Sequence, residues 1–373
     1  MTASSTDGMR DVVAAQSEIT YVDGKKGELR YRGYSISELA SGFNFEEIAY
    51  LLWHGDLPSS SQLARQNELA RSLRAARKDL LDRVEDIPLS AHPLEVMRYV
   101  LCWDALGHPL AWKNDPEANY AKALEFMAWF PSVVTAFHRR RSGLRPIVPR
   151  PDLDTAANFL YMLHGQEADA VAVRTMDTSF VLHADHELNA STFAARVTIA
   201  TQSNLHSAIA SALGTLAGPR HGGASEQVVH MVQEIGSPEN TERWVRGQLQ
   251  ERRRIMGFGH AVYRTVDPRA RHLRDMAEKL LQDTPRESWI SILSALEDVM
   301  QREKGLYPNV DLYAAVVHHA LGIEPAFYTS VFACSRITGW TAHSMEQRDG
   351  RLIRPMAQYV GPQPRSTLVG SAR

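Results

Sequence analysis

Residues 192–217 read TFAARVTIATQSNLHSAIASALGTLA, and apolar side chains recur along this stretch at steps of three and four residues. The apolar positions are Phe193, Val197, Ala200, Leu205, Ala208, Ile209, Ala212, Leu213 and Leu216. This spacing predicts one long helix that is buried along one side. Asn189 or Ser191 can cap its start, and Gly218-Pro219 ends it because proline cannot continue the hydrogen-bond ladder.

Two further helices are predicted toward the C-terminus. The first covers Asp311–Leu321, where Asp311 can cap the start and Gly322 can end the helix. The second begins after Pro325 and continues to about Glu346. Its periodic positions are Phe327, Val331, Cys334, Thr338, Ala342 and Met345. Because helical periodicity dominates most of the chain, the sequence predicts an all-α fold.

One short segment near the N-terminus differs from this helical pattern. Residues 19–32 read ITYVDGKKGELRYR, with β-branched and aromatic residues on both sides of an Asp-Gly and a Lys-Gly turn signal. The segment therefore predicts a small N-terminal β element.

The chain is long enough for more than one domain. Its 373 residues exceed the roughly 250–300 residues at which a single hydrophobic core stops growing. The Gly-Pro and Gly-Gly breaks within residues 218–223 are the best candidates for a boundary, so we expect a hinge there.

Composition argues against several classes of partner and location. Basic residues number 41 and acidic residues 43, so the net charge of -2 disfavours binding to nucleic acid. Cys102 and Cys334 are too few for a disulfide framework or a four-ligand zinc site, which suits a reducing compartment. No signal-peptide core and no run of about 18 apolar residues is present, so we expect a cytoplasmic protein that does not cross a membrane.

Three of the fifteen histidines lie in glycine-rich or polar junctions where they could face a cleft. His186 lies in HADHELNAST, His221 in GPRHGGAS and His260 in GFGHAVYR. His183 and His186 are spaced three apart, which is compatible with metal binding. A zincin motif would need a second histidine at position 190, where Ala190 stands, so a metal site is disfavoured.

Charged residues near these histidines suggest anionic ligands. Three arginines at 252–254 precede Gly257 and Gly259, and the segment could hold a phosphorylated coenzyme or could be an ordinary solvated face. Asp311 as a helix cap would be ionised, and an ionised carboxylate can also serve as a proton-abstracting base. Arg336 lies within an apolar pattern, where a buried guanidinium needs an anion such as a bound carboxylate. Arg269 and Arg354 stand beside prolines and could equally be surface charges.

Seven motifs in one order resemble the citrate synthase family across about Ile19 to Gly361. They are YVDGKKGELRYRGYSI, HADHELNAST, GPRHGG, GFGHAVYRTVDPRA, YPNVD, SRITGW and RLIRP. The resemblance implies an all-α homodimer with an active site in the cleft between two helical domains. The large domain would comprise residues 1–222 and 332–373, and the small domain residues 223–331.

The same resemblance implies a role for each candidate residue. Asp311 would remove the methyl proton of acetyl-CoA, His221 would hydrogen-bond the thioester oxygen, and His260 would protonate the ketone oxygen of oxaloacetate. The oxaloacetate ligands would be His186, Arg269, Arg336 and Arg354, the last contributed by the partner subunit. The coenzyme contacts would be Ile255, Gly257, Phe258 and Gly259. Acetyl-CoA is then a cosubstrate, and no permanently bound cofactor or metal is expected.

Three alternatives remain open from the sequence. A 2-methylcitrate synthase, which uses propionyl-CoA, carries essentially the same motifs, and one methylene is worth only about 1–3 kcal/mol in a pocket. A metallohydrolase would use His183, His186 and a distant carboxylate. A catalytically silent helical dimer would leave the cationic residues without a purpose.

Overall fold

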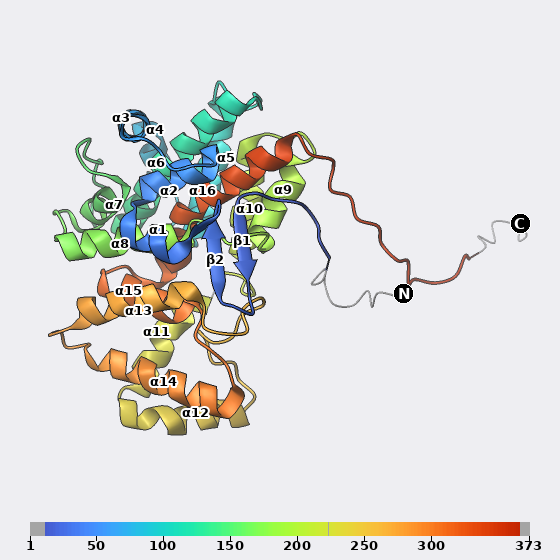
Figure 1. Ribbon diagram of the computed structural model, residues 1–373. Coiled ribbons are helices and arrows are strands. Elements are labelled where there is room, and N and C mark those ends of the chain that lie inside the picture. The colour runs from blue at the N-terminus through green and yellow to red at the C-terminus, as the bar shows by residue number, and fades with distance from the viewer. Residues whose placement is uncertain (1–11, 223, 366–373) are drawn as a thin grey trace, which may run out of the picture.

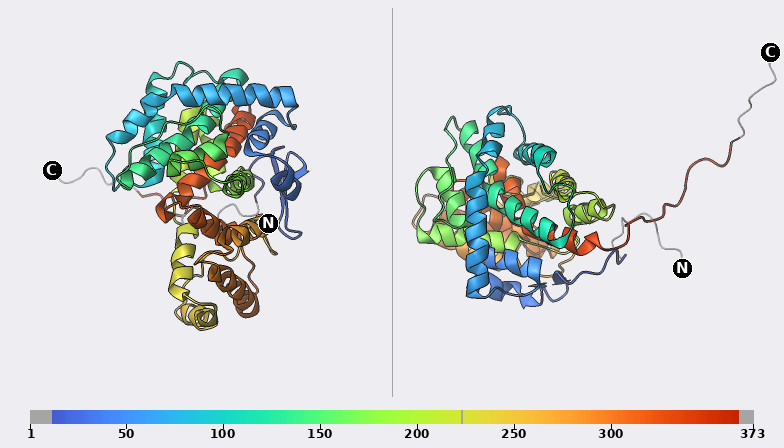
Figure 2. Two further views of the ribbon diagram at one scale, coloured as in Figure 1. Left: turned by 90° about the vertical axis from the view of Figure 1, so that its left-hand side faces the viewer. Right: turned by 90° about the horizontal axis from the view of Figure 1, so that it is seen from above.

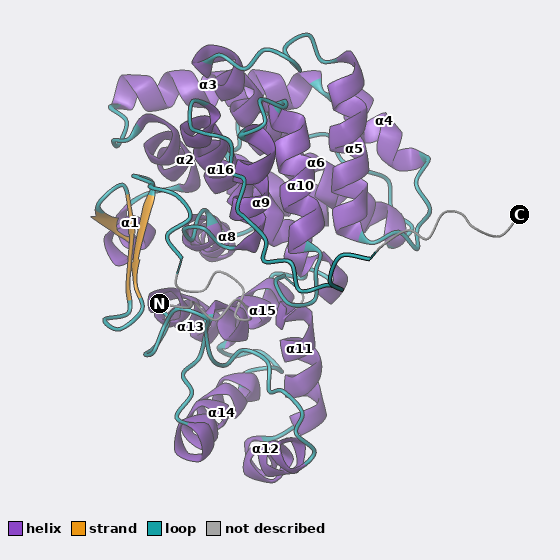
Figure 3. Ribbon diagram, turned by 90° about the vertical axis from the view of Figure 1, so that its right-hand side faces the viewer, coloured by secondary structure: helices purple, strands orange, loops and turns teal. Residues whose placement is uncertain are grey.

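The computed structural model describes residues 12–222 and 224–365. Nearly all regular structure in these residues is helical, as Figure 3 shows. The helices before the predicted hinge are α1 (Ile36–Gly42), α2 (Phe45–His54), α3 (Ser60–Ala76), α4 (Lys78–Glu85), α5 (Pro93–Gly107), α6 (Pro116–Arg141), α7 (Thr155–His164), α8 (Ala170–His183), α9 (Ala190–Ile199) and α10 (Leu205–Leu216). Those after it are α11 (Ala224–Ile235), α12 (Thr241–Gln250), α13 (Pro268–Leu281), α14 (Ser288–Lys304), α15 (Val310–Ala320) and α16 (Tyr328–Arg348), with short 3-10 turns at Pro238–Asn240 and Pro325–Phe327.

The N-terminal β element is present as predicted. Strands β1 (Thr20–Asp23), β2 (Glu28–Tyr31) and β3 (Tyr34–Ser35) form an antiparallel sheet in the order β1-β2-β3, with Val22 opposite Leu29. The chain reverses between β1 and β2 at the predicted glycines, and Gly27 adopts a φ of +68° there.

The helices fall into two groups in space. Figure 1 shows α11 to α15, coloured yellow to orange, below a larger group that contains α1 to α10, and the side view of Figure 2 shows the same division. Helix α16 returns from the smaller group into the larger one, where it packs against α2, α6, α8, α9 and α10. Its buried side chains include Trp340 and Arg336.

The prediction of one helix over residues 192–217 was wrong. The stretch forms α9 and α10, which pack against each other after a break at residues 200–204. Gln202 has a φ of +64°, and the Asn204 side chain accepts the Ser207 N–H at 2.8 Å, which caps α10. Asn114 Nδ2 also donates to the Ser203 carbonyl at 3.1 Å, so a tertiary contact holds the break. The cap of α9 is Asn189, one of the two predicted residues.

The predicted cap of the helix near residue 311 was displaced by two residues. Helix α15 is capped by Asn309, whose side chain accepts the Asp311 N–H at 3.0 Å. Asparagine and aspartate are comparable caps, so the pattern could not distinguish them. Asp311 thus lies in the first turn of the helix, where its carboxylate is available for other contacts.

None of the helices in the described residues combines the length and the apolar character that a bilayer-spanning segment needs. The segment that follows α16 runs away from the helical body in Figure 1.

Candidate active site

A cavity of about 480 Å³ lies between the two groups of helices. Six of the residues singled out from the sequence for catalysis or oxaloacetate binding line it together, namely His186, His221, His260, Arg269, Asp311 and Arg336. They come from the turn between α8 and α9, the turn after α10, the loop before α13, and helices α13, α15 and α16. The fold therefore gathers six residues that span 150 positions of sequence.

His221 lies at the cavity wall, and Ser191 contacts its Nε2 nitrogen. Its Nε2 lies 3.3 Å from the backbone nitrogen of Ser191 and 2.8 Å from Ser191 Oγ. A backbone N–H can only donate, so Nε2 is the acceptor and Nδ1 carries the proton. Burial and the nearby charge of Arg336 lower the pKa of His221 to about 4. A neutral imidazole with a free N–H donor results.

His260 has the opposite tautomer. Its Nδ1 accepts the backbone N–H groups of Val262 at 3.0 Å and Tyr263 at 3.2 Å, so the proton resides on Nε2. Burial and Arg269 lower the pKa of this histidine to about 4. The two histidines thus carry their protons on different ring nitrogens, Nδ1 in His221 and Nε2 in His260.

Asp311 lies at the start of α15, and its Oδ1 accepts a hydrogen bond from Ser225 Oγ at 2.5 Å. Burial raises the pKa of Asp311, whereas Ser225 and Arg269 lower it. The prediction that Asp311 caps the helix was therefore wrong. Its carboxyl group contacts Ser225 instead and is harder to ionise than an ordinary aspartate. A carboxylate whose pKa is raised is also a stronger base.

Arg269 is buried, not exposed, and it is paired within the chain. Asp267 Oδ1 accepts from Arg269 Nε at 3.0 Å, and Asp267 Oδ2 accepts from Nη2 at 2.7 Å. Asp267 also caps α13. This bidentate pair uses one edge of the guanidinium group and leaves the Nη1 side for a ligand.

Arg336 has an almost fully buried guanidinium with few internal partners. Its Nε donates to the His183 carbonyl at 2.7 Å, and its guanidinium carbon lies 4.5 Å from the centre of the Phe332 ring. Within residues 12–222 and 224–365 no carboxylate forms an ion pair with it, and burial lowers its pKa to about 10. A cation with unused donors at a cavity wall suits a ligand carboxylate.

His186 joins the two groups of helices through Tyr263. Its Nε2 lies 3.1 Å from the Tyr263 hydroxyl, and its ring centre lies 5.2 Å from that of His260. Burial and Arg269 hold the pKa of His186 well below its usual range. Three neutral histidines beside two arginines give the cavity a positive character that favours a dianion.

The segment 255–260 is held against residues 307–309. Asn309 Nδ2 donates to the Gly259 carbonyl at 2.9 Å, and Phe258 and Pro308 form an isolated antiparallel bridge. Gly257 has a φ of +82°, and a Cβ there would lie 2.9 Å from Leu312 Cβ. Ile255 packs into the core beneath, whereas Gly259 reaches the cavity wall. Asn309 thus ties the His260 loop to the helix that carries Asp311.

Arg354 lies outside this cavity. It is exposed on the segment after α16 and borders a separate surface hollow with residues 12 and 14–16. The isolated chain therefore does not bring Arg354 to the other six residues.

The histidine pair proposed for metal binding has other partners. His183 Nδ1 donates to the Ser179 carbonyl at 2.7 Å, and His186 contacts Tyr263. In the part of the chain that the structure describes, no group of three or more His, Cys, Asp or Glu side chains is arranged to hold a metal ion.

Several residues that shape the site were not predicted to belong to it: Ser191, which was considered only as a helix cap, and Ser225, Tyr263, Asp267 and Asn309. Ser191 lies 30 positions from His221 and Ser225 lies 86 from Asp311, so only the tertiary fold reveals those contacts. Asp267 carried a local signal, because an aspartate before Pro268 is typical of a helix start.

Comparisons with known proteins point in one direction. A family model described as "Citrate synthase, C-terminal domain" matches residues 8–356. Citrate synthase 2 of Bacillus subtilis (strain 168) is 43% identical over 361 residues, which cover 96% of each chain. The 2-methylcitrate synthase of Mycobacterium tuberculosis (strain ATCC 25618 / H37Rv) is 38% identical over 373 residues, which cover 98% of this chain and 94% of that protein.

Solved structures agree with these matches. Citrate synthase from Thermotoga maritima MSB8 superposes with a TM-score of 0.87 at 38% identity, covering 97% of each chain. Citrate synthase from the thermophilic archaeon Thermoplasma acidophilum, in a ternary complex with carboxymethyl coenzyme A and oxaloacetate, gives a TM-score of 0.91 at 33% identity, again over 97% of each chain.

Proposed function

This chain belongs to the citrate synthase family, and from that premise we propose that it condenses acetyl-CoA with oxaloacetate and hydrolyses citryl-CoA. Such an enzyme is an acyltransferase that converts the acyl group into an alkyl group on transfer. The observation that carries the proposal is the cavity in which His221, His260 and Asp311 lie together with two buried arginines.

The first step is enolisation of the acyl-CoA. Asp311 removes a proton from the methyl carbon, and His221 Nδ1–H donates to the thioester oxygen as negative charge develops there. This role is supported by the Ser191 contact at His221 Nε2, which leaves Nδ1 as the donor. A neutral donor stabilises the enol without requiring a free enolate.

The second step forms the carbon–carbon bond. The nucleophilic carbon attacks the ketone carbon of oxaloacetate, and His260 Nε2–H passes its proton to the ketone oxygen. The proton that Asp311 took from the methyl group balances the one that His260 gives up. The two backbone N–H groups at His260 Nδ1 support this direction of transfer. Water then adds to the thioester carbonyl of citryl-CoA, the C–S bond breaks, and CoA leaves as the thiol.

Oxaloacetate would be bound by His186, Arg269 and Arg336, with Arg354 of the partner subunit completing the set. The unpaired side of Arg269 and the unused donors of Arg336 suit its two carboxylates. The exposed position of Arg354 in a single chain is compatible with a homodimer in which this segment crosses to the other active site.

Acetyl-CoA would be a cosubstrate and not a resident cofactor, and its contacts would be Ile255, Gly257, Phe258 and Gly259. The support for these contacts is indirect, because Gly259 lines the cavity and the other three hold the loop in place.

The two groups of helices would act as domains, with residues 1–222 and 332–373 in the large one and 223–331 in the small one. Closure over oxaloacetate would align the substrates, and such positioning can supply roughly 7–11 kcal/mol of the barrier reduction. If small-angle scattering shows no compaction on addition of oxaloacetate, the proposed domain closure is contradicted.

The cytoplasm is the proposed location, because Cys102 and Cys334 are both free thiols. Nucleic acid and membranes are not proposed as partners, since the chain is nearly neutral overall.

A second candidate is 2-methylcitrate synthase, which is favoured by the 38% identity to a protein of that name. The test is release of the CoA thiol by the purified protein with oxaloacetate and either acetyl-CoA or propionyl-CoA. A higher kcat/KM for acetyl-CoA supports citrate synthase, a higher value for propionyl-CoA supports the alternative, and no release with either rejects both.

A further inference from the structure

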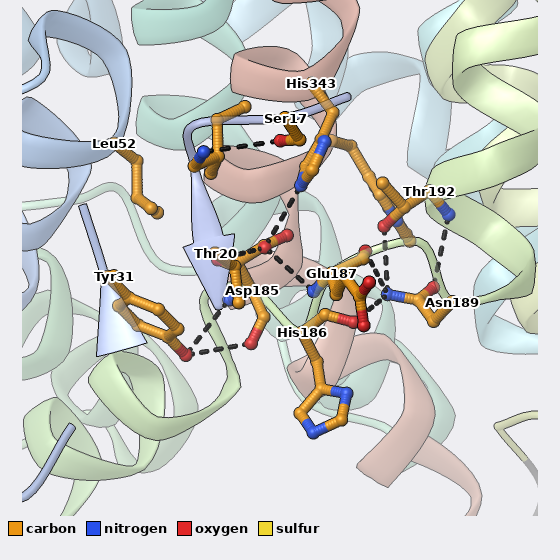
Figure 4. A network of polar contacts seen from close by, with 12 residues as sticks. Ser17, Thr20, Tyr31, Leu52, Asp185, His186, Glu187, Asn189, Thr192 and His343 are labelled. Atoms are coloured by element: carbon orange, nitrogen blue, oxygen red, sulfur yellow. Dashed lines mark hydrogen bonds and ion pairs between the residues drawn. The ribbon is translucent and has the colours of Figure 1, made fainter. Parts of the chain in front are cut away.

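The turn that carries His186 contains a second buried charge. Asp185 lies one residue before His186 and has no exposed surface, yet it does not line the cavity. Figure 4 shows its carboxylate directed toward Thr20 and His343, while the His186 ring lies on the other side of the chain. The proposed chemistry leaves this carboxylate without a role.

Asp185 ties three parts of the fold together. Its Oδ2 accepts hydrogen bonds from Thr20 Oγ1 at 2.6 Å and from His343 Nε2 at 3.1 Å, which belong to β1 and α16. The Asp185 carbonyl accepts from the Tyr31 hydroxyl at 2.9 Å, on β2. The His186 turn is therefore fastened to the small sheet and to the central helix at one residue.

The contact with His343 has a fixed direction. Arg196 Nη1 donates to His343 Nδ1 at 3.0 Å, and a guanidinium group can only donate. His343 therefore carries its proton on Nε2 and donates to Asp185. Glu346 accepts from the same Arg196 at 2.5 Å, so the chain of contacts ends in an ion pair near the surface.

Asp185 also stabilises an unusual backbone conformation. Glu187, the residue after His186, has a φ of +52°, which non-glycine residues rarely adopt. Its N–H donates to Asp185 Oδ2 at 3.1 Å. This hydrogen bond closes over His186 and holds the backbone directly after it.

The same carboxylate packs against the helix that supplies Arg336. A Cβ at Gly339 would lie 2.3 Å from Asp185 Oδ1, so only glycine permits this approach to α16. Arg336, three residues earlier on α16, donates to the His183 carbonyl of the same turn. Burial lowers the pKa of Arg336, and the charge of Asp185 opposes that effect.

We infer that Asp185 is a positioning residue for oxaloacetate, which holds His186 and Arg336 in their binding geometry without touching the substrate. This inference rests on the proposed function. It predicts that loss of the carboxylate impairs oxaloacetate binding selectively, whereas a residue that serves only folding would affect stability alone.

The test compares Asp185→Asn with Asp104→Asn. Asp104 is a matched control because it is also buried and does not line the cavity. Its carboxylate accepts hydrogen bonds from Arg77 Nη2 at 2.7 Å and from His206 Nε2 at 3.0 Å. Both variants should unfold at lower temperature than the wild type. Only Asp185→Asn should raise the KM for oxaloacetate, by about tenfold or more, while the KM for acetyl-CoA stays within about threefold.

A second variant keeps the test decisive if Asp185→Asn does not fold. Thr20→Val removes one hydrogen bond to Asp185 and preserves the side-chain shape, so we expect an increase of about threefold in the KM for oxaloacetate. An unchanged KM in a folded Asp185→Asn, or in Thr20→Val where the first is unfolded, would overturn the inference. Absence of turnover in the wild type would reject the proposed function instead.

Discussion

Ser225 Oγ donates a hydrogen bond to Asp311 Oδ1 at 2.5 Å, and it does so from a different helix, α11. The cavity raises the pKa of Asp311 through burial, and Ser225 works against that increase. The hydroxyl group of a serine 86 positions away thus favours the ionised form that a base needs before it can accept a proton.

Substitution of Ser225 should shift the acid limb of the pH–rate profile. Ser225→Ala removes an interaction that lowers the pKa of Asp311, so this pKa rises further and activity is lost at a higher pH than in the wild type. Measurement of kcat between pH 4 and 8 would show the shift, and Ser225→Thr, which retains a hydroxyl group, serves as the control. An acid limb that does not move in Ser225→Ala would contradict the role given to this hydrogen bond.

Asp311→Asn should abolish turnover and stabilise the protein at neutral pH. The folded-state pKa of Asp311 lies above its unfolded value, so the ionised form costs stability above the folded-state pKa, and this cost disappears as pH falls below the unfolded value. An amide avoids the cost at every pH. We expect a fall in kcat of at least ~10²-fold together with a higher Tm at pH 7 than the wild type, measured by calorimetry. A lower Tm in the variant at pH 7 would contradict this.

Arg336→Lys should weaken oxaloacetate binding, whereas Asp311→Asn should leave it largely intact. Lysine keeps a positive charge but cannot form two parallel bonds to a carboxylate, and a charged hydrogen bond contributes roughly 1.5–3 kcal/mol. Calorimetric titration with oxaloacetate alone should show about a tenfold or greater loss of affinity for Arg336→Lys. An equal loss of oxaloacetate affinity in both variants would contradict the separate roles given to Asp311 and Arg336.

Much of the site was accessible from the sequence because its residues lie in distinctive local contexts. His186, His221 and His260 stand among glycines or polar residues, and Arg336 interrupts an apolar pattern, so each was recognisable without the fold. The structure places these four and Asp311 around one cavity. Their roles remain predictions.

Other features depended on contacts that the sequence does not encode locally. The break between α9 and α10 contains Thr201, Gln202 and Ser203 but no glycine or proline. The apolar spacing continues across it, so periodicity alone predicts one uninterrupted helix. The sequence predicts Asp311 as the cap of α15, whereas the structure uses Asn309, because both residue types cap helices well. Arg269 can be buried because it is paired with Asp267. Its position next to Pro268 in the sequence does not reveal that pairing.

Gly257→Ala should disturb the His260 loop more than a matched glycine substitution. Both Gly257, at φ +82°, and Gly305, at φ +62°, would strain an alanine by roughly 1–3 kcal/mol, but only at Gly257 would the new Cβ meet Leu312, at 2.7–3.0 Å. We expect Gly257→Ala to lower both Tm and kcat, and Gly305→Ala to lower Tm alone. Equal kcat values in the two variants would show that the loop does not need this close approach.

The most direct test of the central claim follows the methyl carbon of acetyl-CoA. The purified protein is given oxaloacetate and acetyl-CoA labelled with ¹³C in the methyl group, and both labelled citrate and free CoA are quantified by mass spectrometry, with Asp311→Asn in parallel. We predict equal amounts of labelled citrate and CoA from the wild type, and neither above background from the variant. Release of CoA without labelled citrate, or equal citrate from both proteins, would contradict the assignment of this cavity as the site of condensation.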